Sequence, residues 1–108
     1  MRIKSELLWG ESIRNRNRVF DLLQAAKLPF GYYLLLCTEN YELEIIPAGM
    51  QNNRYQNKKA CLVFGIAYGK NEAQNMISDL LCRVFVKKQY ASVKELCREI
   101  IEEPICSD

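Results

Sequence analysis

Apolar residues recur at helical spacing in three segments of the chain. Periodicity over residues 12–27 predicts a first helix with Ser12 as its N-cap, and Pro29 lies beyond its end. A third helix is predicted to start at Ser92, because "SVKE" has the spacing of a capping box, and Pro104 stops it. The second helix has the clearest stripe: Ala73, Met76, Ile77, Leu80, Leu81, Val84 and Phe85.

Strand-like runs lie between the first two predicted helices. Residues 30–37 ("FGYYLLLC") and 41–47 ("YELEIIP") flank the turn "TEN" and predict a β-hairpin that Pro47 closes. Residues 60–68 are apolar on both alternations, which predicts a central strand buried on both faces, with Gly65 at a bulge or a close helix crossing. Residues 48–59 form the longest predicted loop. Ahead of the first helix, "SELLWG" is expected to form a short turn on the core.

These elements predict one α+β domain spanning residues 1–108. Its fold is a three-stranded antiparallel sheet covered by helices, in the order α-β-β-β-α-α. Because two helices already cover such a sheet, the third has little apolar surface left to cover. If its stripe is not internal, that stripe supports a homodimer.

Composition and charge narrow the class of protein. The chain has 108 residues, of which 49% are hydrophobic and 26% charged, as in ordinary globular domains. The net charge of +2 is too small to imply a polyanionic partner. Basic residues concentrate near the start, where "RNRNR" is the densest cluster. The start lacks a secretory signal pattern and no apolar run reaches membrane-spanning length, so we expect a cytoplasmic protein without membrane contact.

The cysteine and histidine content argues against several chemistries. The five cysteines are widely spaced and form no C-x-x-C pair, so zinc-finger and thioredoxin-like interpretations fail and reduced thiols are expected. Histidine is absent, which removes the commonest general base and the histidine-activated nucleophiles. We therefore predict a non-enzymatic protein with no catalytic residue, metal or cofactor.

The stretch around Gly65, Gly69 and Lys70 invites comparison with a phosphate-binding loop. That motif reads G-x-x-x-x-G-K-[ST], but here the loop is one residue short and Asn71 replaces the hydroxyl residue. A structural interpretation is favoured, in which Asn71 is the N-cap of the second helix and Gln74 completes a capping box. Binding of a single phosphate at this helix start, assisted by Lys70, is the alternative.

The order helix, three strands, helix over residues 12–86, with "GKNEAQNMISDLL" opening the second helix, resembles the double-stranded-RNA-binding domain. The resemblance implies that topology, with Lys70, Ala73 and Gln74 at the positions of the family's K-K-x-A-K motif. Asn71 and Gln74 replace two of the lysines, and "TEN" stands in place of the Gly-Pro-x-His loop. The segment "VFGIAYGKNEAQNMISDLL" is also similar to a pattern in small bacterial proteins of unassigned function.

Candidate binding residues are mainly cationic. Arg14 and Arg18 lie one turn apart on the polar side of the first helix, whereas Arg16 falls among its apolar residues and needs a partner or an anion. Trp9 either anchors a partner or covers the open end of the core. The candidates, each with a solvated-surface alternative, are Arg14, Arg16, Arg18, Arg54, Tyr55, Lys58, Lys59 and Lys70.

The sequence therefore predicts a protein-interaction module that binds another protein or itself, the latter through the third helix. The alternative is a weak nucleic-acid-binding domain that uses Arg14, Arg18 and the 48–59 loop. A nucleotide-binding enzyme is the third hypothesis.

Overall fold

The structure, a computed structural model, describes residues 2–51 and 62–102. Over these ranges the chain forms a mixed sheet flanked by helices. Its elements, in chain order, are β1 (Arg2–Trp9), α1 (Arg16–Gln24), β2 (Tyr32–Cys37), β3 (Leu43–Pro47), the 3-10 turn η1 (Ala48–Met50), β4 (Leu62–Tyr68), α2 (Lys70–Phe85) and α3 (Val93–Glu102).

The sheet has four strands in the order β1-β4-β2-β3. The predicted hairpin is confirmed, since β2 and β3 pair antiparallel and β3 ends at Pro47. The predicted central position of the third run is also confirmed, because β4 lies between β1 and β2 and is buried over most of its length. The α+β class is therefore correct, but the prediction of a three-stranded antiparallel sheet is wrong, because β1 joins as a fourth strand parallel to β4.

The extra strand contains the "SELLWG" segment, which was predicted to be a turn. The element order is thus β-α-β-β-β-α-α, rather than α-β-β-β-α-α. Pairing between β1 and β4 is irregular: Ile3 pairs with Val63 and Leu8 with Gly65, so residues 4–7 stand opposite Phe64 alone. A bulge of this kind bends an edge strand and limits its pairing with other chains.

Of the two alternatives predicted at Gly65, a bulge or a close helix crossing, the structure has a bulge at the neighbouring residue, where β4 pairs with β2. Leu35 pairs with Gly65 and Leu36 with Val63, which leaves Phe64 as the extra residue. A Cβ at Gly65 would lie 3.3 Å from both the Leu35 side chain and the Leu8 carbonyl oxygen, so the position favours glycine.

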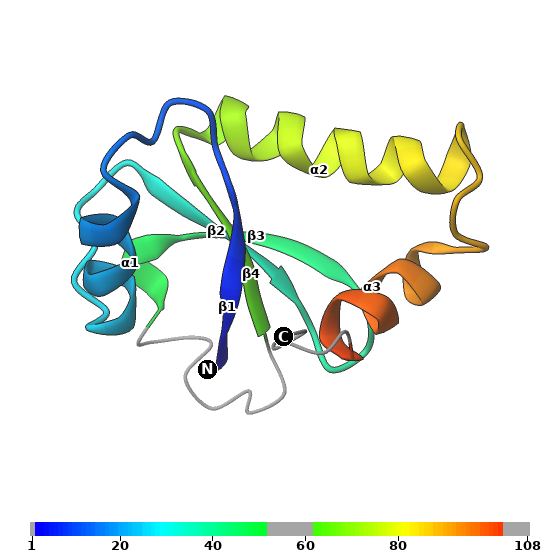
Figure 1. Cartoon of the computed structure of the whole chain (residues 1–108), viewed down its shortest axis with the longest axis horizontal. Helices are drawn as coiled ribbons and strands as arrows, with labels where there is room; N and C mark the ends of the chain where they lie inside the picture. Colours follow the sequence, from blue (N-terminus) through cyan, green and yellow to red (C-terminus); the bar gives the residue numbers. More distant parts are fainter. Residues whose placement is uncertain (1, 52–61, 103–108) are drawn as a thin grey trace.

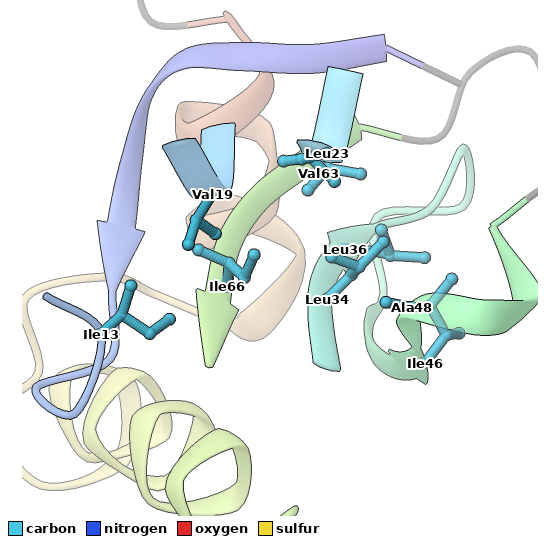
Figure 2. Close-up of a cluster of buried hydrophobic side chains, with 9 residues drawn as sticks. All are labelled: Ile13, Val19, Leu23, Leu34, Leu36, Ile46, Ala48, Val63 and Ile66. Carbon is cyan, nitrogen blue, oxygen red and sulfur yellow. The ribbon is translucent and has the colours of Figure 1, made fainter. Parts of the chain in front are cut away.

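One face of the sheet carries α1 and the first hydrophobic core (Figure 2). Leu34 is at its centre, because it pairs with Ile46 on one side and Ile66 on the other and is fully buried. Figure 2 shows side chains from α1, β2, β3, β4 and η1 in this core. The buried residues are Ile13, Val19, Leu23, Leu34, Leu36, Ile46, Ala48, Val63 and Ile66.

The other face carries α2 and α3, which lie across the sheet from α1 (Figure 1). The stripe of α3 is internal, with Leu96 at 2% and Cys97 at 0% exposure. A dimer through α3 was predicted only if its apolar stripe is not internal. That condition is therefore not met at these two residues. Homodimerisation itself stays a prediction. The second core contains Leu35, Cys37, Phe64, Ala67, Ala73, Leu80, Val84, Leu96 and Cys97.

Helix α1 is shorter than predicted at both ends. It begins at Arg16 after the N-cap Asn15, and not at Ser12, because the Ser12 hydroxyl donates to the distant Glu72. It ends at Gln24, because Ala26 takes a left-handed conformation with φ of 56°. The amides of Ala26 and Lys27 then donate to the carbonyls of Leu23 and Leu22, the pattern of a Schellman motif.

Two further parts of the prediction are clear in the structure. The Ser92 hydroxyl accepts a hydrogen bond from the Glu95 amide at 3.2 Å, which confirms Ser92 as the cap of α3. The start of the predicted 48–59 loop is the turn η1, and the buried Gln51 side chain donates to the Leu23 carbonyl at 3.1 Å.

Across the described ranges, no helix has the length and apolar character needed to cross a membrane.

Two buried thiols join β2 to α3 in the second core. Cys37 and Cys97 are both free and fully buried. Hydrogen bonding with Cys97, together with burial, raises the pKa of the Cys37 thiol, whereas the same bond lowers the pKa of Cys97. Because thiol reactivity requires an accessible thiolate, these two residues act as core residues.

Candidate binding surface

A groove of about 720 Å³ lies between β1 and α1, and we call it the α1-side groove. Its strand wall includes Ser5, Glu6 and Leu7, which belong to the bulged segment of β1. The bulge therefore forms part of the groove wall. Bulges are common at sheet edges and beside functional sites. The volume falls in the range of sites that hold small ligands or the side chains of a peptide.

Aromatic residues from both elements line this groove. Trp9 at the end of β1 and Phe20 on α1 are both partly exposed. Trp9 also packs against the first core, so its indole is held at the surface by buried neighbours. A large aromatic side chain that is partly buried and partly exposed is typical of binding hot spots.

Arg16 has a clear partner in the structure. Its guanidinium carbon lies 5.6 Å from the centroid of the Trp9 ring, a cation–π contact across the α1-side groove. This contact explains why an arginine occupies an apolar position on α1, a feature that the sequence could not assign. The groove also contains Glu6 and Asp21, so both signs of charge surround an aromatic centre.

The structure separates the other predicted binding residues. Arg14 and Arg18 are exposed but do not line the α1-side groove, where only Arg16 of the cluster contributes. Lys70 is exposed at the first residue of α2 and does not line this groove. The predicted candidates Arg54, Tyr55, Lys58 and Lys59 lie outside the described residues.

Sequence reasoning missed most of this groove. Phe20 falls within the apolar periodicity of residues 12–27, and Glu6 and Asp21 belong to no motif. The short apolar run from Leu7 to Trp9 was the available signal, but the partner strand β4 begins more than fifty residues later. Of the groove residues, only Trp9 and Arg16 were predicted as possible partner contacts.

A carboxylate, rather than Asn71, organises the start of α2. Gly69 is the N-cap, and Asn71 is the second residue of the helix, so the prediction of Asn71 as the cap is wrong. Glu72 accepts hydrogen bonds from the Tyr68 amide (2.9 Å), the Ser12 amide (3.0 Å) and the Ser12 hydroxyl (2.8 Å). It thereby joins the β4–α2 junction to the segment after β1.

The surroundings of Glu72 favour its ionised form. Burial opposes that form, but the hydrogen bonds from Tyr68 and Ser12 outweigh it and hold the pKa of Glu72 below its ordinary value of 4.5. A Cβ at Gly10 would overlap the Glu72 carboxylate, so a side chain there would displace that carboxylate from its hydrogen bonds with Tyr68 and Ser12. The end of β1 that carries Trp9 is therefore held to α2 by this carboxylate.

Replacing Glu72 with glutamine is expected to lower the free energy of unfolding at neutral pH by about 1 kcal/mol, because an amide cannot accept all three bonds. Because the folded pKa is lowered, the carboxylate contributes fully above pH 4.5 and loses its contribution as pH falls through the folded value. Urea titrations of wild type and variant should therefore converge in acid. Glu99→Gln, at an exposed position on α3, is the control and should change stability by less than about 0.5 kcal/mol. Equal stability of wild type and Glu72→Gln at neutral pH would contradict this role.

Comparison of the chain with models of known protein families, with curated proteins and with solved structures finds no significant match. Over residues 2–51 and 62–102, no group of three or more cysteine or acidic side chains is arranged to hold a metal ion. Function is therefore inferred from the geometry of the described residues.

Proposed function

We propose that the chain is a non-enzymatic protein-interaction module and that the α1-side groove receives a segment of another protein. The observation that carries this proposal is Trp9, an indole anchored in the core and partly exposed at a groove of about 720 Å³. Tryptophan and arginine are the residue types most enriched among binding hot spots. Here the two are in contact.

The chemistry of the groove suits a peptide segment. Trp9 and Phe20 offer apolar and aromatic surface, and Arg16, Glu6 and Asp21 offer charged hydrogen-bonding groups at its border. Protein interfaces combine an apolar, often aromatic centre with a polar rim in this way. The bulge in β1 disfavours regular addition of a further strand, so recognition relies on side chains entering the groove.

Peptide selection tests the proposal directly. A displayed library of random peptides is selected on the folded protein, and enriched peptides without tryptophan are titrated while the fluorescence of Trp9, the single tryptophan, is followed. Asn17→Arg adds bulk in the groove at an exposed α1 position and should weaken binding by about tenfold or more. Asn71→Arg changes an exposed helical asparagine outside the α1-side groove, so it is the matched control and should bind as wild type does.

Two results would contradict the proposal. One is a selection that enriches no peptide on the wild type above the background of Asn17→Arg. The other is a set of peptides that bind both variants equally well, since these would occupy some other surface.

Nucleic-acid binding is the second candidate function. It is supported by Arg14 and Arg18, which are exposed just before and within the first turn of α1, where the helix dipole adds positive potential. Backbone-directed RNA binding of this kind should weaken steeply with salt, and Arg14→Gln with Arg18→Gln should reduce the slope. Absence of salt-dependent RNA binding by the wild type at low ionic strength would exclude it.

A further inference from the structure

A second groove lies on the other side of β1, and we call it the α2-side groove. Its volume is about 470 Å³, and its walls are the end of β1, from Leu8 onward, and the stretch of α2 between Glu72 and Arg83. Trp9 lines both grooves, so the two are adjacent at this residue. Each residue in the range 5–11 lines at least one of them.

The two grooves flank the outer edge of the sheet. β1 is the first strand in the sheet order, and among the described residues β4 is its one partner. Figure 1 shows the molecule from this edge, with α1 on one side of β1 and α2 on the other. The Gly10 amide donates to the Ile66 carbonyl and so points toward β4. Because the backbone groups of successive strand residues point in opposite directions, the Trp9 amide and carbonyl point away from β4, toward the outer edge.

The side chains at the end of β1 alternate between the two faces of the sheet. Leu7 and Trp9 pack against the first core, whereas Leu8, which is 42% exposed, lines the α2-side groove. An extended chain lying beside β1 has the same period of two, so its successive side chains point toward different grooves. The bulge at residues 4–7 interrupts this edge, so backbone pairing with such a chain is confined to the residues that follow the bulge.

We propose that the segment received by the α1-side groove lies extended along β1 and places a second side chain in the α2-side groove. One side chain enters beside Trp9 and Phe20, and a side chain one or three positions away along the segment enters the second groove. The Trp9 amide and carbonyl pair with the backbone of the segment where it crosses the edge. This inference rests on the proposed function, because it concerns the same ligand.

The lining of the α2-side groove indicates which segment it accepts. Leu8, Met76 and Leu80 provide an apolar surface, which suits an apolar side chain of the segment. The two grooves together contain five carboxylates and two guanidiniums, the latter from Arg16 and Arg83. The lining is therefore net negative, and complementary charge favours a segment whose polar positions are net basic.

A variant on the α2 side separates this inference from the proposed function. Asn75 is exposed and lines the α2-side groove, so Asn75→Arg should weaken the peptides enriched on the wild type by about tenfold or more. Gln74→Arg changes the adjacent exposed position, which lines neither groove, and should bind as wild type does. Weakening by Asn17→Arg alone would overturn the inference and leave the proposed function intact. Peptides that Asn17→Arg does not weaken would contradict both.

Alanine substitutions along the tightest of these peptides test the extended geometry. Two peptide positions should each lose about tenfold in affinity, one of them only while Asn17 is present and the other only while Asn75 is present. Because alternate side chains of an extended chain share a face, the two positions should be an odd number of residues apart. An even separation, one position coupled to both variants, or enriched peptides of net negative charge would overturn the proposal.

Discussion

Replacing Leu23 with alanine is expected to lower the free energy of unfolding by about 2–5 kcal/mol. Leu23 lies on α1 at 0% exposure, packed in the first core. The loss combines the transfer free energy of the removed carbons with the cavity that remains among residues held by the sheet. Since domains of this size are typically stable by about 5–15 kcal/mol, much of the native stability would be lost.

Urea or thermal denaturation measures this effect. Leu22→Ala is the matched control, because the neighbouring leucine on the same helix is only partly buried and should cost clearly less. Equal losses for the two variants would contradict the orientation of α1 on the sheet. The carbonyl of Leu23 also accepts the Gln51 side chain, so α1 should lose its contact with η1 if it shifts to fill the cavity.

Leu96→Ala should have an effect of similar size, about 2–5 kcal/mol. Leu96 is 2% exposed and belongs to the second core, which α3 completes against α2 and the sheet. If α3 instead docked only against a partner, truncation would change self-association and leave the stability of the monomer nearly unaltered. The variant therefore separates a structural role for this helix from a role in assembly.

The measurement is the midpoint and slope of urea denaturation at several protein concentrations. A concentration-independent loss identifies α3 as part of the domain core, whereas a loss that appears only in the dimer would contradict the observed packing. Leu81→Ala on α2 is the control, since this leucine is partly exposed and should lose less stability.

The sequence predicts elements whose signals are local. The stripes of α2 and α3, the Ser92 cap and the hairpin that Pro47 closes all follow from spacing and turn chemistry within a few residues. The central position of β4 was readable from an apolar run on both alternations. Except for Phe85, which belongs to the predicted α2 stripe but is 64% exposed, these features were confirmed because tertiary contacts reinforce the local preference.

The predictions are wrong where contacts with residues distant in the sequence determine the local structure. Ser12 is a good N-cap by residue type, but Glu72, sixty residues away, takes both its amide and its hydroxyl, and the helix starts at Arg16. The capping preference of Asn71 was overridden in the same cluster. β1 becomes a strand only by parallel pairing with β4, which no short-range pattern indicates.

The candidate site was less predictable than the fold. The sequence analysis selected clusters of cationic residues, yet Arg14, Arg18 and Lys70 do not line the α1-side groove. Arg16 was selected because it falls among the apolar residues of its helix. Its cation–π contact with Trp9 accounts for that position. A single arginine at a position where an apolar residue is expected therefore indicated the groove better than the clustering of cationic residues did.

Chemical-shift mapping of a bound peptide tests the central claim that the α1-side groove is the binding surface. The tightest peptide from the selection is titrated into isotope-labelled protein, and amide shifts are followed. The account predicts changes concentrated in residues 5–9 and 16–21, absent in Asn17→Arg. Changes confined to α2 and α3, or retained in that variant, would contradict it.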